Sequence, residues 1–162
     1  METAQEAVIF YFSGTGNTRF CAHSLAKALA ARGLGARVVS IESPRAAELA
    51  RTVGPRSLPV FAYPVYGSDI PGPMRRFLRG LPAATRGDGN AAPIPRDAAV
   101  FCTQLAFSGD GAALADEDLL PLGYRARWTA HVLMPNNICL SVLRFPYTND
   151  PERLEKARKR AE

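Results

Sequence analysis

Apolar residues in this chain gather in short runs separated by longer segments with helical spacing. The first run, Ala7–Phe12, is continuous and partly aromatic. Runs of this length are typical of strands buried on both faces of a parallel sheet. The β-rich apolar runs predict five strands, at Ala7–Phe12, Ala36–Ile41, Leu58–Tyr63, Ala98–Gln104 and Arg125–Leu133.

A helical segment follows each predicted strand. Thr18–Arg32 is rich in Ala and Leu and stops at Gly33, a residue common just after helix ends. Ser43 and Pro44 suit the N-cap and the first position of a second helix. The predicted helices are Thr18–Arg32, Pro44–Val53, Met74–Leu81, Gly111–Leu122 and a last helix from Pro151 onward. This alternation predicts an α/β fold with helices on both faces of a parallel sheet.

One stretch, Pro82–Arg96, departs from the alternation because it is rich in Pro, Gly, Ala and Asn. Such a composition predicts an exposed loop. The strand pattern resumes after it, and a length of 162 residues corresponds to about one domain. We therefore expect a single domain over residues 1–162.

Composition excludes several classes of protein. With 47% hydrophobic and 22% charged residues the chain is expected to be globular. No apolar run approaches the roughly 18 residues of a membrane span, so no membrane partner is expected. Glu2 and Glu6 precede the first apolar run without a basic flank, which does not fit a secretory signal and favours a cytoplasmic location. The three cysteines lack CxxC spacing, so neither zinc nor a four-thiolate cluster is predicted.

The net charge of +5 favours anionic partners. Charge alone would permit nucleic acid. We expect no nucleic-acid partner, and the most informative feature of the chain is the loop after the first strand.

That loop, Ser13–Thr18, joins the first strand to the first helix. Backbone N–H groups converge at a helix N-terminus, and glycines let the backbone approach an anion closely. The loop has no Gly-Lys-Ser/Thr ending, and Arg19 stands where a dinucleotide fingerprint has its third glycine. The sequence therefore predicts a phosphate held by hydroxyls and amides, without a lysine.

These residues carry a resemblance to a known family. Ser13–Thr18 resembles the FMN phosphate loop of flavodoxins, Ser/Thr-x-Thr-Gly-x-Thr directly after the first strand. Tyr63–Pro71 resembles the second flavin loop, and Thr103–Gly111 falls where the third is expected. Together with Met134–Asn137, these segments are most similar to the flavodoxin half of bacterial flavodoxin–ferredoxin fusion proteins. The resemblance spans essentially the whole chain.

The resemblance implies a flavodoxin-like, three-layer, doubly wound, five-stranded parallel sheet in the order 2-1-3-4-5. Counting strands and helices leads independently to the same architecture. The resemblance also implies FMN, bound noncovalently at the carboxyl edge of the sheet, as a one-electron cofactor.

The resemblance assigns roles to individual residues. Tyr66 is the candidate for stacking on the isoalloxazine, the alternative being a tyrosine that packs at the strand end. Gly67 lacks a Cβ, and in flavodoxins the peptide of such a glycine changes orientation with the redox state of the flavin. Phe107 either shields the ring or packs inward. The implied cofactor-binding residues are Ser13, Gly14, Thr15, Gly16, Asn17, Thr18, Pro64, Val65, Tyr66, Gly67, Thr103, Gln104, Phe107 and Gly109.

The charge departs from the family pattern. Flavodoxins are typically acidic, whereas this chain is basic, so the resemblance and the charge together predict an acidic, ferredoxin-like redox partner or a reductase. Arg75, Arg76 and Arg79 are the candidate docking patch, the alternative being scattered surface arginines. Asp69 and Asp110 would disfavour a fully reduced, anionic flavin if they lie close to it, and are otherwise solvated carboxylates.

Three functions remain open at this point. The first is an electron carrier that shuttles single electrons between redox partners and needs no catalytic residue. The second is an FMN-dependent NAD(P)H quinone or small-molecule reductase on the same fold. The third is a non-redox module that has lost its cofactor, which the intact phosphate loop disfavours. Because no cysteine-rich module follows, the chain is expected to be either a stand-alone carrier or one half of a longer protein.

Overall fold

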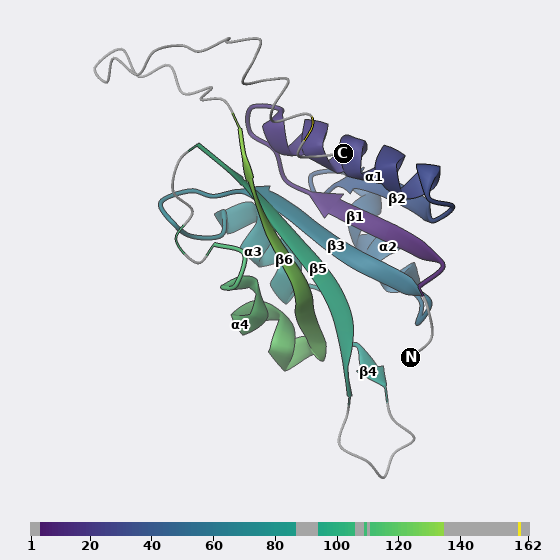
Figure 1. Ribbon diagram of the computed structural model, residues 1–162. Helices are drawn as coiled ribbons and strands as arrows, with labels where there is room; N and C mark the ends of the chain where they lie inside the picture. The colour runs from purple at the N-terminus through teal and green to yellow at the C-terminus, as the bar shows by residue number, and fades with distance from the viewer. Residues whose placement is uncertain (1–3, 87–93, 106–108, 110, 135–158, 160–162) are drawn as a thin grey trace, which may run out of the picture.

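The computed structural model describes residues 4–86, 94–105, 109, 111–134 and 159. Over these residues a twisted β-sheet is the central layer, and helices pack on both of its faces (Figure 1). The arrangement is the three-layer α/β architecture that the alternation of strands and helices predicts.

Five parallel strands form the body of the sheet. They are β1 (Glu6–Tyr11), β2 (Gly35–Ser40), β3 (Ser57–Pro64), β5 (Ile94–Gln104) and β6 (Tyr124–Leu133). Their order is β2-β1-β3-β5-β6. Because β5 and β6 are the fourth and fifth of the parallel strands, this is the predicted order 2-1-3-4-5. The order reverses direction at β1 and β3, and ligands of such sheets bind at this switch point.

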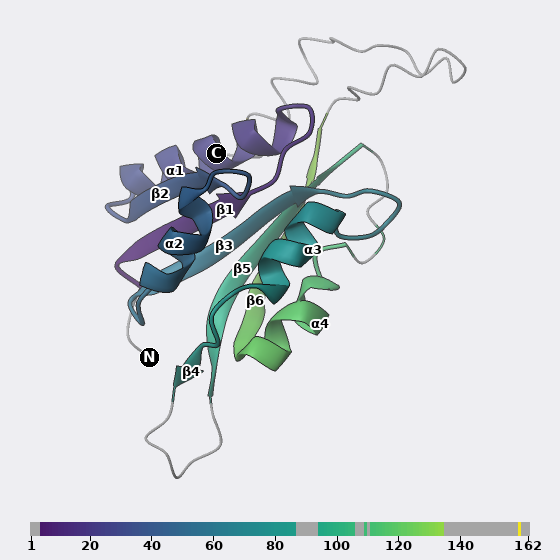
Figure 2. The ribbon, with the colours of Figure 1, turned by 180° about the vertical axis from the view of Figure 1, so that it is seen from behind.

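The helices divide between the two faces of the sheet. Helix α1 (Asn17–Ala31) covers one face, and α2 (Arg45–Thr52), α3 (Gly72–Arg79) and α4 (Ala115–Leu119) cover the other (Figures 1 and 2). A short 3-10 turn, η1 (Leu120–Leu122), continues from α4. Helix α2 begins one residue after its predicted start, and the Ser43 hydroxyl accepts a hydrogen bond from the Arg45 N–H at 3.3 Å.

Each face of the sheet has its own hydrophobic core. On the side of α2, α3 and α4, Phe10 stacks on Phe61 with ring centroids 5.9 Å apart, and Phe77 packs against Phe10. On the α1 side, Ile9 and Val60 pack with residues of the helix. Neighbouring residues of β1 thus enter opposite cores, which explains why its apolar run is continuous.

The predicted boundaries of three elements are wrong. Helix α3 spans Gly72–Arg79, whereas Met74–Leu81 was predicted. The fourth helix was expected over Gly111–Leu122, but α4 starts at Ala115, and Pro121 lies in the 3-10 turn that ends the segment. Proline cannot donate the backbone hydrogen bond of a longer α-helix and its ring clashes with the preceding turn. The fourth parallel strand starts at Ile94, before the predicted Ala98, because its first residues pair antiparallel with a two-residue strand, β4 (Thr85–Arg86). Of the expected last helix, only Lys159 is described.

At the amino end of the sheet, Arg96 of β5 binds the connection between α2 and β3. Its guanidinium, in a side chain that is 8% exposed, donates to the carbonyls of Val53 and Ser57 at 2.7 Å each and also to that of Gly54. It also lies 5.9 Å from the ring centroid of Tyr124. Buried charges are tolerated where hydrogen bonds of this kind satisfy them. Arg96 therefore ties the α2–β3 connection to β5 and β6.

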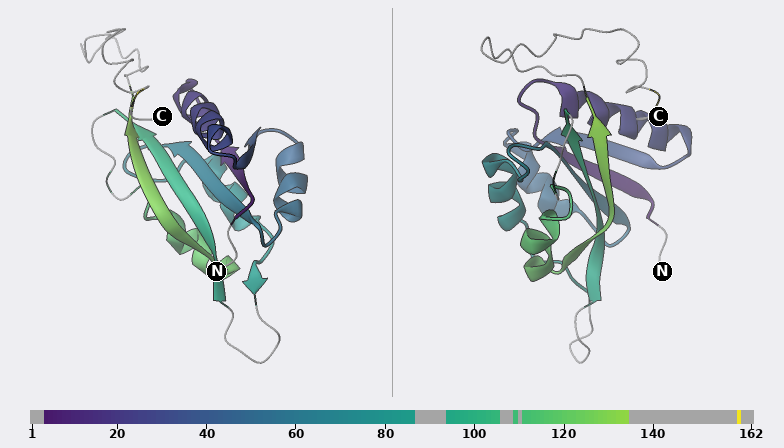
Figure 3. Two further views of the ribbon diagram at one scale, coloured as in Figure 1. Left: turned by 45° about the vertical axis from the view of Figure 1, so that its right-hand side comes forward. Right: turned by 60° about the vertical axis from the view of Figure 1, so that its left-hand side comes forward.

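The α1 face has an apolar hollow near β6. Helix α1 packs over β2, β1 and β3 (Figure 3). Beside the helix lies a cavity of about 260 Å³ that opens to the surface. We call it the Trp128 groove; it is lined mainly by Leu25, Leu29, Leu58, Val60, Phe101 and Trp128. None of the helices in the described ranges is both long enough and apolar enough to span a membrane.

Candidate functional site

Three loops meet at the carboxyl edge of the sheet, because they follow the adjacent parallel strands β1, β3 and β5. Direct contacts connect them. The Val65 N–H donates to the Thr103 carbonyl at 2.9 Å, and the hydroxyls of Thr18 and Thr103 lie 2.8 Å apart. The sequence placed the candidate site on these three loops, and the structure brings them together.

The first loop directs backbone N–H groups toward one point. The Ser13 hydroxyl accepts from the N–H groups of Gly16 at 3.1 Å and Arg19 at 3.2 Å. Gly16 has φ +95°, a left-handed conformation that favours glycine, and it directly precedes α1. Helix α1 has no acidic residue in its first turn and no side-chain cap at this position. An anion with several acceptor oxygens is suited to this concentration of donors and to the helix dipole.

The six predicted phosphate residues do not all lie at the surface. Gly14, Thr15 and Gly16 are exposed, and Ser13 and Asn17 are partly buried. Thr18 is 1% exposed, and its hydroxyl faces Thr103. In this structure the Thr18 side chain therefore connects the first loop to the third.

The second loop turns back on itself at its tip. Tyr66 and Asp69 form an antiparallel bridge with N–H to carbonyl distances of 3.2 and 3.1 Å. Between them Gly67 has φ +59° and Ser68 φ +66°, signs that belong to a type I′ turn. Ser68 is the single non-glycine residue with positive φ in the part of the chain that is described. The turn holds Tyr66 at its start and Asp69 at its end.

Tyr66 lies against the first loop with an accessible ring. The side chain is 51% exposed, and its ring meets that of Phe12 edge to face at 6.4 Å. A Cβ added to Gly14 would come within 2.6 Å of the Tyr66 hydroxyl oxygen. Glycine at position 14 thus lets the tyrosine approach the first loop.

The third loop is described in part. Thr103 is 3% exposed and Gln104 is partly exposed, with its Oε1 3.3 Å from Nδ1 of His131. Gly109 has φ +53° and packs closely on Ser68, since a Cβ there would lie 2.7 Å from the Ser68 Cβ. Phe107 and Asp110 lie outside the described residues, so their predicted roles stay predictions.

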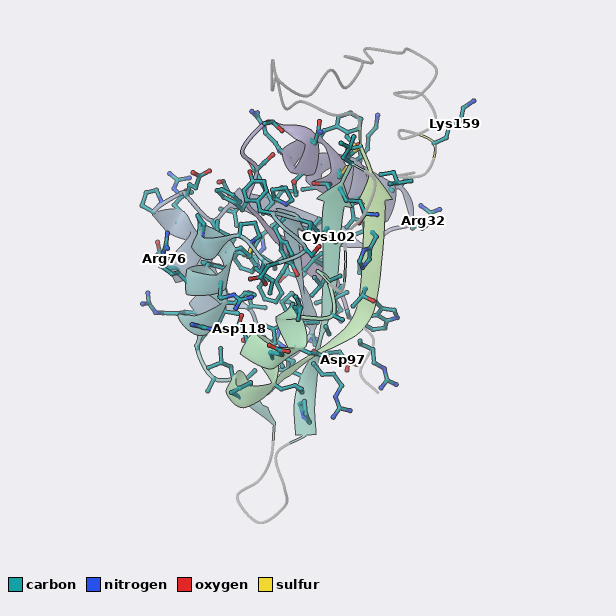
Figure 4. All side chains as sticks on the ribbon, turned by 90° about the vertical axis from the view of Figure 1, so that its left-hand side faces the viewer. Arg32, Arg76, Asp97, Cys102, Asp118 and Lys159 are labelled. Carbon is teal, nitrogen blue, oxygen red and sulfur yellow. The ribbon has the colours of Figure 1, made fainter. Side chains whose placement is uncertain are left out.

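The buried side chains beneath the loops are neutral. The Tyr63 hydroxyl donates to the Gly111 carbonyl at 2.6 Å, and burial raises the pKa of this phenol far above its ordinary value. Burial also raises the pKa of the Cys102 thiol to about 11, and this residue lies inside the sheet (Figure 4). Within the described ranges no three His, Cys, Asp or Glu side chains gather as a metal site would require.

A network of ion pairs beside the second loop was not predicted from the sequence. Asp69 pairs with Arg75 of α3, and Arg75 Nε lies 3.6 Å from Asp118 Oδ2 of α4. Arg79 Nε lies 2.7 Å from the other oxygen of Asp118. Two of the three arginines of the candidate docking patch are therefore paired with carboxylates, whereas Arg76 is exposed at the outer edge of the molecule (Figure 4).

Comparison by sequence finds no relative. No protein-family model matches the chain, and neither does the sequence of any curated protein.

Comparison by structure finds many flavodoxin-like proteins. A flavodoxin from the domain Archaea has a TM-score of 0.60 and 16% identity, with 96% of this chain and 93% of that chain covered. The two-electron reduced flavodoxin of Megasphaera elsdenii has a TM-score of 0.57 and 18% identity, with 96% and 97% covered. Rubredoxin oxygen:oxidoreductase from Desulfovibrio gigas has a TM-score of 0.63 and 15% identity; the match covers 99% of this chain but 35% of that one.

These likenesses establish the fold. The chain has the flavodoxin-like α/β fold, with its five parallel strands in the order 2-1-3-4-5. At identities below a fifth, the likeness describes architecture, and function has to be argued from the site.

Proposed function

We propose that this protein binds FMN at the carboxyl edge of its sheet and shuttles single electrons between redox partners. The observation that carries the proposal is the Ser13–Thr18 loop, whose N–H groups converge at the start of α1 beside the exposed ring of Tyr66. A phosphate site next to an accessible aromatic face fits a ligand with a phosphate at one end and a flat ring system at the other.

The residues present fit FMN. Ser13 and Thr15 supply hydroxyls for the phosphate, and a phosphate oxygen would replace the Ser13 hydroxyl as the acceptor of the Gly16 N–H, so no lysine is required. Tyr66 supplies a stacking face, because an aromatic ring interacts with another through dispersion and a matched quadrupole. The absence of a Cβ at Gly14 lets the Tyr66 hydroxyl lie directly against the first loop. FMN would supply the one-electron chemistry, and the protein would bind it, orient it and tune its potential.

The finer assignment is also a proposal. We place the chain with the flavodoxin half of flavodoxin–ferredoxin fusion proteins, on the likeness of the three loops and Met134–Asn137. The partner we propose is an acidic, ferredoxin-like donor or a reductase, because the chain carries a net charge of +5.

The first test compares FMN with riboflavin, which lacks the phosphate. Flavin-free protein is titrated with each and followed by quenching of flavin fluorescence. FMN is expected to bind at least about tenfold more tightly, since hydrogen bonds to a charged group contribute about 1.5–3 kcal/mol. Thr15→Asp places a negative charge on the loop and should weaken FMN binding while leaving riboflavin binding unchanged. Equal affinities of the unaltered protein for both flavins would contradict the proposed phosphate site.

The second test separates a carrier from a reductase. The FMN-loaded protein is reduced stepwise without oxygen, first with NAD(P)H and then with dithionite, while its visible spectrum is recorded. A carrier should ignore NAD(P)H and take up two electrons in separate steps. Direct bleaching by NAD(P)H would favour the reductase, and failure to bind FMN would reject both.

A further inference from the structure

The network beside the second loop connects the turn at Tyr66 to two helices. Asp69 closes that turn, and its Oδ1 accepts the N–H of Ile70 at 2.7 Å and a bond from Arg75. Ile70 is 4% exposed, so the end of the turn is fixed to the hydrophobic core. One guanidinium thus holds the residue that lies across the bridge from Tyr66.

Arg75 is itself held in place from the other side. Its Nε faces Asp118, whose side chain is 8% exposed and also pairs with Arg79. A carboxylate this buried needs cationic partners, because an uncompensated buried charge is strongly destabilising. The buried Asp118 therefore orients Arg75 toward the exposed Asp69, and the four side chains together form a neutral cluster.

We propose that Arg75 is a positioning residue of the flavin site that fixes the Tyr66–Asp69 turn and neutralises the Asp69 carboxylate beside it. This inference rests on the proposed binding of FMN against Tyr66. Without Arg75 the negative charge of Asp69 would stand uncompensated near the ring. Such a charge disfavours the fully reduced, anionic flavin more than the neutral oxidised one.

The test compares reduction potentials in the FMN-loaded protein. In Arg75→Gln, the affinity for fully reduced FMN relative to one-electron-reduced FMN should fall about fivefold. At 59 mV per tenfold change, this lowers the potential of the second one-electron step by about 40 mV. Arg76→Gln removes the same charge from an exposed position on the same helix and is the matched control. Arg76→Gln should change the potential of the second one-electron step by only a small fraction of the shift expected for Arg75→Gln.

Asp69→Asn should shift the potential of the second one-electron step in the opposite direction. This variant leaves Arg75 paired with Asp118 but removes the negative charge nearest the turn, so the second potential should rise. In the double variant Arg75→Gln/Asp69→Asn the potential should return toward that of the unaltered protein. If Arg75 acted only in folding, the two variants would not shift this potential in opposite directions. The Asp69→Asn measurement remains informative even if Arg75→Gln fails to fold.

The outcomes separate this inference from the proposed function. If the unaltered protein does not bind FMN, both are rejected. If it binds FMN but Arg75→Gln and Arg76→Gln have the same potentials, or if Asp69→Asn lowers the potential, the role of Arg75 is rejected and FMN binding stands.

Discussion

Gly33 and Gly123 have the same backbone conformation in very different surroundings. Both have φ +80°, in the left-handed region that side chains rarely adopt. A Cβ at Gly33 would meet open space, whereas at Gly123 it would come within 2.5 Å of the Ala84 carbonyl oxygen. The two positions therefore separate the cost of backbone conformation from the cost of a steric clash.

We expect Gly33→Ala to lower the free energy of unfolding by about 1 kcal/mol, the cost of the left-handed conformation alone. Gly123→Ala should cost about 3 kcal/mol, because backbone atoms of residue 84 must also move. Urea denaturation of both variants measures the difference. Equal decreases in the free energy of unfolding would mean that the backbone around Ala84 moves at little cost.

The cysteines of the core should be unreactive in the folded protein. Cys21 is 3% exposed and Cys102 is fully buried, and burial raises the pKa of each thiol to about 11. The thiolate is the reactive form, so neither should react with a thiol reagent at pH 8. In a Cys139→Ser variant, no thiol should be titrated under native conditions and two should appear in urea. Rapid labelling of the native variant would show that one of these cores opens readily.

At the scale of elements, Glu6 joins the starts of three strands. From β1 its Oε1 accepts from Ser57 of β3 at 2.6 Å and from Arg37 of β2 at 2.7 Å. The hydrogen bond from Ser57, together with Arg37, holds the pKa of this carboxyl below its ordinary value despite some desolvation. Because the folded protein favours the charged form, this contribution to stability is present above the ordinary pKa near 4.5 and is lost as the pH falls through the folded-state value.

Glu6→Gln should therefore remove part of the pH dependence of stability. At pH 7 the variant should be less stable by about 0.5 kcal/mol, since the pair is partly exposed, and this difference should shrink as the pH falls through the folded-state pKa. Urea midpoints measured from pH 3 to 7 check this. Glu42→Gln, at an exposed carboxyl, serves as the control and should shift the midpoint little at any pH. A difference for Glu6→Gln that does not shrink between pH 7 and pH 3 would indicate a packing effect instead.

The main elements could be predicted from the sequence, but their pairing with short or distant segments could not. Apolar runs located all five parallel strands, and they are most continuous in β1 and β3, whose central residues are buried on both faces. The strand at Thr85–Arg86 has no apolar signature, and it exists because it pairs with the extended start of β5. The fourth helix was predicted too long because its composition is helical while Pro121 restricts its end.

The candidate site was predicted to a similar extent. The motif Ser13–Thr18 located the first loop, because an anion-binding loop needs glycines and hydroxyl side chains close together in the sequence. The link between Thr18 and Thr103, and that between Arg75 and Asp118, join residues far apart in the sequence. No local pattern marks such pairs, and only the folded arrangement of β5, α3 and α4 reveals them.

At the scale of the whole molecule, the exposed charge of Arg76 on α3 is open to a direct test. Arg76 is exposed, whereas Arg75 and Arg79 are engaged with carboxylates. Arg76→Glu should slow electron transfer from a reduced acidic ferredoxin several-fold at low ionic strength, and the effect should shrink as salt screens the charges. Stopped-flow measurement of flavin reduction provides the rate.

The matched control is Arg127→Glu. Arg127 is an exposed residue near the start of β6, toward the end of the sheet opposite the loops. The same change in net charge at this position should alter the rate much less. Equal effects of the two reversals would mean that overall charge, and not a docking patch on α3, governs the encounter.

The fluorescence of Trp128 reports on whether the Trp128 groove is covered. Trp128 is the only tryptophan of the chain, and its side chain is 50% exposed at the edge of an apolar hollow. Indole emission moves to shorter wavelength when water is excluded from the ring. Excitation selective for indole will therefore reveal whether any other part of the chain, or a second protein, covers this face of the sheet.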